Sequence, residues 1–473
     1  MASTGIRPRR TAPSARSVEQ RGIEHVPLTA RWGGPANLLG LWAGAVSNVE
    51  FLIYGCLAVI IFQLSFAQAV AMILIGNLSY LLTGLASLQG PQAGTTTFTV
   101  SRAAFGPRGN KIPTFFNWIT QVGFEIEGIA LIVFAAIALA AGGGMLAGTP
   151  AKIIFIILAV AIQAVLPLLG HAAALKVLPL LAIPFAVLFV IMAVITAPKV
   201  SLHAAAHGAG WGSMTVFLAL VIAAGGLGWT ENANDYSRYL PPETSRSRIV
   251  LAVAIGAAVP SALLEILGAA VATGVPGADS VTGLTASFPG WFIVPYLIVA
   301  IIQLFAINTL DLYSSGVTLQ SLIPGLKRLH CVAIDTVVCG LLAAVAVFST
   351  RFFTLLSDFI LFLIVWLGPW CAIYLVDWLL RRGRYDPAGL LDERGGRYFR
   401  RGGVHWPAII AQAIGMAAAA AWLNAYSPYV SALSSRFGES DFSVLLGLVF
   451  GGGTYWLLAR QSVRAEGAAT PTV

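Results

Sequence analysis

The chain has 473 residues, of which 58% are hydrophobic and only 10% are charged, and its mean hydropathy is +0.82. A soluble protein of this length carries roughly 25% charged residues, so the composition excludes a water-soluble globular fold. The formal net charge of +8 comes from short polar segments rather than from one basic face, so it does not indicate nucleic-acid binding.

Apolar runs of about 20 residues recur along the chain, and each is long enough to cross the hydrocarbon core of a bilayer. We therefore predict an all-α polytopic membrane protein. Twelve spans are predicted, at about 37–61, 68–88, 112–140, 151–169, 175–197, 213–235, 249–273, 291–316, 331–349, 353–380, 406–425 and 442–460.

The polar segments divide these spans into groups. With the N-terminus in the cytoplasm, every large cluster of Arg and Lys falls on the cytoplasmic side, as the positive-inside rule requires. We expect a multi-pass protein of the plasma (inner) membrane with both termini cytoplasmic. The expected parts are a cytoplasmic N-terminal segment (1–36), a ten-helix core (37–380, with repeats 37–197 and 213–380), a cytoplasmic loop (381–405), two additional transmembrane helices (406–460) and a cytoplasmic tail (461–473).

Two spans are interrupted by glycines and polar residues. The first contains LWAGAVSNVEFLIYGCLA (41–58), and the sixth leads through AAGGLGWTENANDYSRYLP (223–241). Irregular backbone at membrane depth is tolerated where it is buried in protein or lines a wet cavity. The two spans are five apart and run in opposite directions, which is the arrangement of an inverted five-helix repeat around a transporter's binding site. The alternative is a pair of ordinary kinked helices.

Two further spans carry polar groups at depth. In the third span, Phe124 and Gly128 share a face that Gln121 and Glu127 flank, while Glu125 points about 100° away from it. The sequence leaves open which of the two glutamates faces a cavity. In the eighth span, one face carries Asn308, Asp311 and Ser315. Carboxylates inside a membrane are costly and usually face the interior of the bundle, so we expect these spans to converge on one site.

Asp235 and Arg238 lie three residues apart at the cytoplasmic end of the sixth span. They form either the ion pair of an inner gate or a solvated pair that contributes only a few tenths of a kcal/mol. The sequence shows no phosphate-binding loop, no metal-binding cluster and no nucleophile elbow. We therefore expect no cofactor, no metal and no enzymatic activity.

Several stretches resemble the purine–cytosine permeases of the nucleobase–cation symporter group, which share the LeuT-type fold. These stretches are VEQRGIEHVPLTAR (18–31), GPQAGTTTFTVSRAAFGPRGNKIPTFFNW (90–118), GWTENANDYSRYLP (228–241) and INTLDLYSSG (307–316). The resemblance implies a LeuT-like 5+5 inverted repeat plus two C-terminal helices. It also implies a secondary active transporter that imports a nucleobase-type heterocycle with a cation by alternating access.

The resemblance also implies a binding site. Trp229 would be a stacking platform, and Phe124 falls where relatives have a second aromatic residue. A flat heterocycle suits two aromatic faces, because a base stacked on an aromatic side chain gains roughly 1–3 kcal/mol. The predicted substrate-binding residues are Trp229, Phe124, Gly228, Gln121, Glu127, Asn308, Asp311 and Ser47. Cytosine, a purine or a related compound is expected, with allantoin or a hydantoin as the alternative.

The coupling ion depends on a departure from the family pattern. Sodium-coupled members have Ser or Thr early in the eighth span, whereas residues 304–307 here are Leu, Phe, Ala and Ile. Desolvated carboxyl groups can hold protons instead. We expect H⁺ rather than Na⁺ as the coupling cation, with Glu50, Glu127, Glu231 and Asp311 as the candidate carriers. A passive facilitator and a non-transporting sensor are the alternative functions.

Overall fold

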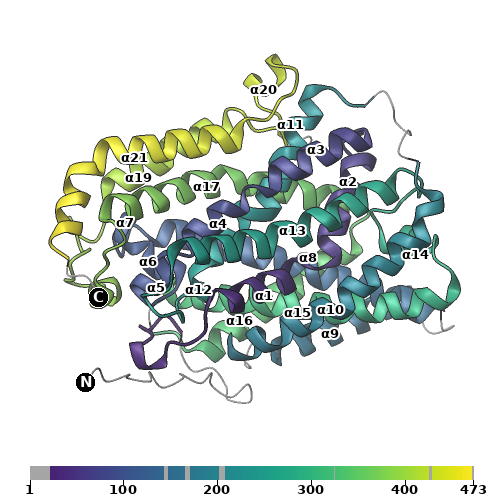
Figure 1. The fold of residues 1–473 in the computed structure, drawn as a ribbon, viewed down its shortest axis with the longest axis horizontal. Helices are drawn as coiled ribbons and strands as arrows, with labels where there is room; N and C mark the ends of the chain where they lie inside the picture. The colour runs from purple at the N-terminus through teal and green to yellow at the C-terminus, as the bar shows by residue number, and fades with distance from the viewer. Residues whose placement is uncertain are drawn as a thin grey trace, which may run out of the picture.

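The computed structural model describes residues 22–142, 148–165, 171–201, 208–323, 325–425 and 429–470, except the side chains of 171–177 and 179. Most of the long helices run side by side along one axis (Figure 1). The first and last described residues lie at the same end of this bundle, at the left of the view. Within the described ranges the only β-type pairing is an isolated bridge between Asn424 and Val430, so the predicted all-α class is confirmed.

The helices fall in three groups along the chain. The first contains α1 (Pro35–Val46), α2 (Val49–Ile60), α3 (Phe66–Asn77), α4 (Tyr80–Ala86), α5 (Gln89–Ala93), α6 (Thr97–Val100), α7 (Arg102–Phe105), α8 (Lys111–Gly142), α9 (Thr149–Val165) and α10 (His171–Thr196). The second contains α11 (Trp211–Ile222), α12 (Ala233–Ser237), α13 (Arg246–Ala272), α14 (Val281–Thr285), α15 (Gly290–Leu322), α16 (Arg328–Phe348) and α17 (Phe352–Arg381). The third contains α18 (Pro387–Leu391), α19 (Trp406–Ala420), α20 (Ala432–Arg436) and α21 (Ser443–Ala468).

Every predicted span overlaps a helical segment. Among the described residues, nine helices are long and apolar enough to cross a membrane, or ten if α1 and α2 form one bent span. The remaining two predicted spans correspond to α9 and α19, which are shorter apolar helices of 17 and 15 residues. The number of twelve crossings therefore stays a prediction. The helix α21 continues to Ala468, so much of the predicted tail is helical, while residues 1–21 and 471–473 lie outside the described ranges.

The predicted interruption of the first span is present. The helix α1 ends at Val46, α2 begins at Val49, and the two axes differ by 55°. The side-chain oxygen of Asn48 accepts hydrogen bonds from the N–H groups of Glu50 (2.9 Å) and Phe51 (3.3 Å). An N-cap of this kind satisfies donors that a helix start leaves unpaired. Asn48 therefore lets a helix begin again in the middle of the membrane.

The sixth span is broken over a longer stretch. A π-helical turn, η4 (Ala223–Leu227), and a 3₁₀ turn, η5 (Gly228–Asn232), separate α11 from α12, and Gly225 is non-helical. The freed backbone groups find partners in the second span: Gly226 N donates to Ser79 Oγ (3.2 Å), and Thr83 Oγ1 donates to Gly226 O (2.6 Å). A Cβ at Gly226 would lie 2.1 Å from Tyr80 N. Only glycine permits this close approach.

The helices α8 and α15 meet at another glycine. Asn308 of α15 donates to the carbonyl oxygen of Glu125 (3.2 Å) and to Gln163 Oε1 of α9 (2.8 Å). A Cβ at Gly128 would lie 2.2 Å from Asn308 Oδ1. Gly128 therefore makes room for the amide of Asn308, which joins three helices.

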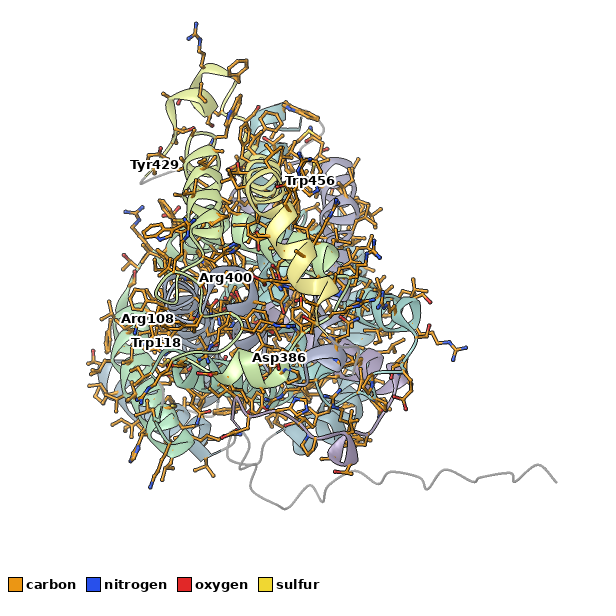
Figure 2. All side chains as sticks on the ribbon, turned by 90° about the vertical axis from the view of Figure 1, so that its left-hand side faces the viewer. Arg108, Trp118, Asp386, Arg400, Tyr429 and Trp456 are labelled. Carbon is orange, nitrogen blue, oxygen red and sulfur yellow. The ribbon has the colours of Figure 1, made fainter. Side chains whose placement is uncertain are left out.

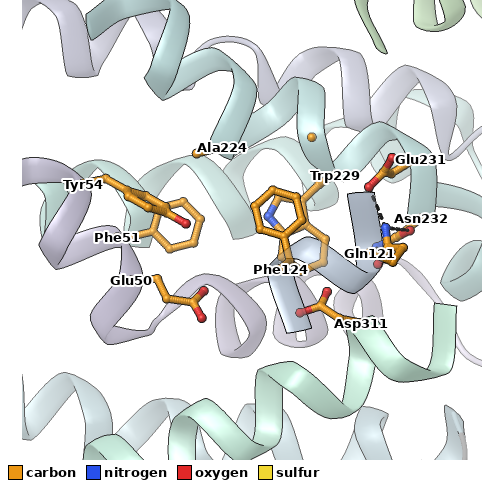
Figure 3. A pocket seen from close by; sticks show the side chains of 11 residues that line it. Glu50, Phe51, Tyr54, Gln121, Phe124, Ala224, Trp229, Glu231, Asn232 and Asp311 are labelled. Atoms are coloured by element: carbon orange, nitrogen blue, oxygen red, sulfur yellow. Dashed lines mark hydrogen bonds between the residues drawn. The ribbon is translucent and has the colours of Figure 1, made fainter. Parts of the chain in front are cut away.

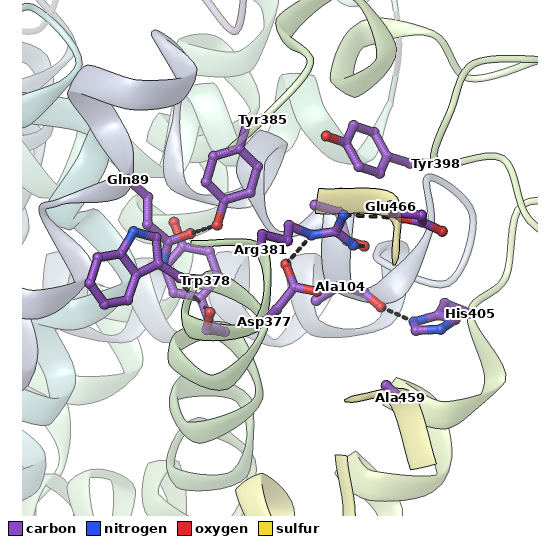
Figure 4. A network of polar contacts seen from close by, with 12 residues as sticks. Gln89, Ala104, Asp377, Trp378, Arg381, Tyr385, Tyr398, His405, Ala459 and Glu466 are labelled. Atoms are coloured by element: carbon purple, nitrogen blue, oxygen red, sulfur yellow. Dashed lines mark hydrogen bonds and ion pairs between the residues drawn. The ribbon is translucent and has the colours of Figure 1, made fainter. Parts of the chain in front are cut away.

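The last long helix, α21, is attached to α17 by a polar network (Figure 4). Arg381 donates to Asp377 (2.7 Å) and to Glu466 of α21 (3.0 Å), and Tyr455 of α21 donates to Asp377 (2.7 Å). Arg400 of the connecting loop also pairs with Glu466. This network lies at the end of the bundle seen face-on in Figure 2, where Arg400 is labelled.

We predict that Gly226→Ala lowers the free energy of unfolding by about 1–3 kcal/mol, because the new methyl group overlaps the backbone of the second span. Thermal unfolding in detergent measures this loss. The matched control is Gly453→Ala, where a Cβ meets nothing within 4 Å. Equal stability of the two variants would contradict the close approach.

We predict that Gly128→Ala pushes the Asn308 side chain away and costs about 1–3 kcal/mol in lost hydrogen bonds. Removing the displaced amide should remove the clash. The Gly128→Ala/Asn308→Ala double variant should therefore be less destabilised than the sum of the single variants. Additive single and double effects in thermal unfolding would show that the two residues do not touch.

Candidate functional site

A small cavity lies where the two interrupted spans face α8 and α15 (Figure 3). The interruptions place its walls, because each break ends a helix at mid-depth and lets side chains point into the bundle. The lining residues are Glu50, Phe51 and Tyr54 of α2, Gln121 and Phe124 of α8, Ala224, Gly228, Trp229, Glu231 and Asn232 of the broken sixth span, and Asp311 of α15.

Two aromatic side chains occupy the centre of the lining, Trp229 and Phe124. Trp229 packs edge to face against Trp42 of α1, with ring centroids 5.4 Å apart. Phe124 packs in the same way against Phe359 of α17, at 5.6 Å. The cavity volume is about 20 Å³, whereas ligand pockets usually measure about 300–1,000 Å³. The lining has therefore closed to roughly the size of one water molecule.

Three carboxyl groups line the same cavity, those of Glu50, Glu231 and Asp311, and all three residues are buried. No Lys, Arg or His stands among its described lining residues. Glu231 Oε1 accepts from Gln121 Nε2 (2.5 Å), while Glu231 Oε2 has no partner among the described residues. Buried charges without a counter-ion are costly, so these groups need protons or a ligand that donates hydrogen bonds.

Gln121 and Asn232 form the polar end of the cavity. Gln121 Nε2 donates to Asn232 Oδ1 (3.0 Å), and Asn232 Nδ2 donates to Gln121 Oε1 at 3.4 Å. Each amide carries both donors and acceptors, so a ligand edge of either kind can be accommodated after a rotation of the amide.

The structure brings together most of the residues predicted from the sequence. Trp229, Phe124, Gly228, Gln121 and Asp311 all line the cavity, and so do the predicted carriers Glu50 and Glu231.

Three predicted binding residues do not line it. Glu127 lies behind Tyr54, whose hydroxyl donates to Glu127 Oε1 at 2.9 Å. Asn308 is engaged in the α8–α9–α15 contact described above. Ser47 lines a separate apolar cavity between α10 and α13. Of the two glutamates in α8, Glu127 contacts the lining residue Tyr54, whereas Glu125 accepts from Cys339 of α16 (3.0 Å).

The two residues predicted as a gate do not pair with each other among the described contacts. Asp235 Oδ1 accepts from the N–H of Thr97 (3.0 Å), and Arg238 donates to Tyr313 OH of α15 (2.7 Å) and to Gly22 O (2.6 Å). Both are buried, so the solvated pair is also absent. Each side chain instead fastens this end of the sixth span to a different segment.

Sequence reasoning missed Phe51, Tyr54, Ala224 and Asn232 as lining residues. Glu50 and Tyr54 are four residues apart and therefore share a face of α2. The sequence shows this spacing. It does not show which face of α2 turns inward, because that depends on where the helix restarts at Asn48.

Residues 25–446 match the family model described as permease for cytosine/purines, uracil, thiamine and allantoin. A putative purine-cytosine permease of Bacillus subtilis is 29% identical, over 94% of this chain and 97% of the relative. A purine-cytosine permease of Emericella nidulans is 27% identical, over 78% of this chain and 74% of the relative.

Among solved structures, the chain is similar to Mhp1, a nucleobase–cation-symport-1 family transporter, in a closed conformation with bromovinylhydantoin bound. The TM-score is 0.77 at 18% identity, covering 97% of this chain and 98% of that one. The likeness supports the expected LeuT-like fold. On the extent of the family match, this chain belongs to the permeases for cytosine and purines, uracil, thiamine and allantoin.

Proposed function

We propose that this protein is a secondary active transporter of the plasma (inner) membrane that imports a nucleobase-type heterocycle by symport with protons. The observation that carries the proposal is the cavity between the interrupted spans, which combines four aromatic rings, Trp229 and Phe124 at its centre, with three carboxyl groups. Alternating access would expose this cavity to each side in turn. The distribution of Arg and Lys supports cytoplasmic termini.

The lining favours a flat ring with several hydrogen-bond donors. Trp229 and Phe124 supply faces for stacking, while Glu50, Glu231 and Asp311 offer acceptors when ionised. Amino groups and protonated ring nitrogens suit such acceptors, as in cytosine or an aminopurine. Because the cavity is nearly closed, the two aromatic side chains have to separate before a ring can enter.

Proton coupling is supported by the same carboxyl groups. Ionised carboxylates in one small buried cavity repel each other strongly, because the surrounding dielectric constant is low. At least one of them is therefore expected to carry a proton, and substrate binding would change how the protons are shared. Residues 304–307 of α15 offer no hydroxyl for sodium, since they are Leu, Phe, Ala and Ile, and Leu304 and Ile307 are buried.

The buried contacts of Asp235 and Arg238 close the cytoplasmic end of the sixth span in this conformation. Opening to that side would require the bonds to Thr97 and Tyr313 to break. We therefore expect these contacts, rather than a mutual ion pair, to act as the inner gate.

We predict that an inward proton gradient, and not a sodium gradient, drives accumulation of one heterocycle from a panel of cytosine, uracil, adenine, hypoxanthine, allantoin and hydantoins into proteoliposomes. Asp311→Asn and Glu231→Gln should lose this accumulation, because the carboxamide cannot carry the proton. Exchange of labelled for unlabelled substrate should persist at raised substrate concentration, because the carboxamide oxygen still accepts a hydrogen bond. Accumulation that survives in both variants would contradict proton coupling through these groups, and a facilitator would show no accumulation at all.

We predict that Trp229→Ala weakens substrate binding by about 5- to 150-fold, corresponding to the loss of one stack of roughly 1–3 kcal/mol. Equilibrium binding of the labelled substrate in detergent measures the change. Trp406→Ala is the matched control, because Trp406 is exposed on α19 and does not line the cavity. Equal affinities of the two variants would exclude Trp229 from the site.

A further inference from the structure

A second cavity, of about 370 Å³, opens at the end of the bundle where the described chain begins and ends. Three separate segments form its walls. They are α5 with Leu88 before it, the turn 242–246 with the first turn of α13, and the turn 382–385 that follows α17. It lies apart from the closed cavity between the interrupted spans, and it shares no lining residue with it.

Three arginines line this second cavity, Arg246, Arg382 and Arg384. Among the described residues, none of their guanidinium groups has a hydrogen bond or an ion pair, although Arg246 lies over the ring of Trp378 at 5.9 Å. The buried Arg381, at the same end of the bundle, does form ion pairs, with Asp377 and Glu466. The lining arginines are therefore free to bind an anion.

The lining contains one acidic residue, Glu243, against these three cations. Positive charge is therefore in excess. The N-terminus of α13 adds partial positive charge. No side-chain cap from Ser245 occupies its first N–H groups. Arginine forks match the geometry of a phosphate group, which binds two N–H donors at once.

Hydrogen bonds fix two lining residues of this cavity, Tyr385 and Gln92; the bond of Tyr385 is seen in Figure 4. Tyr385 donates to Gln89 Oε1 (2.7 Å), and Trp378 Nε1 donates to Gln92 Oε1 (2.9 Å). Gly383 has a positive φ of 74°, and a Cβ there would lie 2.3 Å from Gln92 Oε1. The turn that carries Arg382 and Arg384 is therefore fixed against α5, which holds both backbones in place.

The helix α13, which contributes Arg246 and Ile249 to the cavity, also carries an exposed apolar face. Leu251, Ile255, Val259 and Leu263 recur every four residues, and each is at least half exposed. The stretch they cover is about 18 Å long, close to the ~15 Å of one leaflet of a bilayer's hydrocarbon core. A ligand with a phosphate group at one end and an acyl chain at the other matches both features.

We propose that this cavity is a binding site for an anionic phospholipid, with its phosphate held by Arg246, Arg382 and Arg384 and its acyl chain along α13. The bound lipid bridges the end of the second span, the beginning of the seventh and the end of the tenth. Residues 242–246 come soon after the broken sixth span. The bound lipid therefore stabilises the segment that anchors this span.

The test is lipid binding to the full-length protein in detergent, with dioleoylphosphatidylglycerol, dioleoylphosphatidylcholine and inorganic phosphate as separate probes. The cavity variant is Arg246→Gln/Arg382→Gln/Arg384→Gln. The matched control is Arg394→Gln/Arg401→Gln/Arg464→Gln, which removes the same charge from exposed arginines that do not line the cavity. Thermal unfolding and heterocycle binding of each variant establish that it is folded.

The proposal predicts that phosphatidylglycerol binds more tightly than phosphatidylcholine, and that the cavity variant loses at least roughly tenfold in affinity while the control changes little. A triple lysine variant, which keeps the charge, should retain most of the affinity. Equal losses in the cavity and control variants would overturn the site in favour of general surface charge. Inorganic phosphate that competes as well as the lipid would overturn the lipid as its ligand.

Discussion

Backbone groups inside a membrane need partners, and the two interrupted spans leave several of them free. Side chains from within the bundle supply the missing bonds: Asn48 caps the restart of the first span, and Ser79 and Thr83 bind the break in the sixth. These partners have to be polar and have to lie at mid-depth. The breaks therefore bring polar groups and aromatic side chains to one place, where α8 and α15 complete the walls of the small cavity.

The carboxyl groups follow from the same constraint. Glu50 follows the break in the first span and Glu231 lies within the break in the sixth, whereas Asp311 approaches from the unbroken helix α15. A helix that continued straight would carry these side chains elsewhere. At its far end the sixth span is held by Thr97 and Tyr313 and then leads into the arginine-lined cavity, so movement of this span is linked to both proposed sites.

Much of this arrangement could be predicted from the sequence. The glycines and polar residues at 223–241 indicated the break, and depth in the membrane together with family resemblance placed Trp229 and Asp311. Phe51 and Tyr54 were missed because aromatic residues in an apolar run look like ordinary core. Asn308 does not line the cavity because the missing side chain at Gly128 lets its amide reach α8, and such a fit depends on two helices at once.

The central claim is that the heterocycle and a proton bind together at the carboxyl-lined cavity. Calorimetric titration of the purified protein with its substrate, in buffers of different ionisation enthalpy, counts the protons taken up or released on binding. The account predicts proton uptake at neutral pH that disappears in Asp311→Asn or in Glu231→Gln. Substrate binding with the same heat in every buffer, and hence with no linked proton, would contradict it.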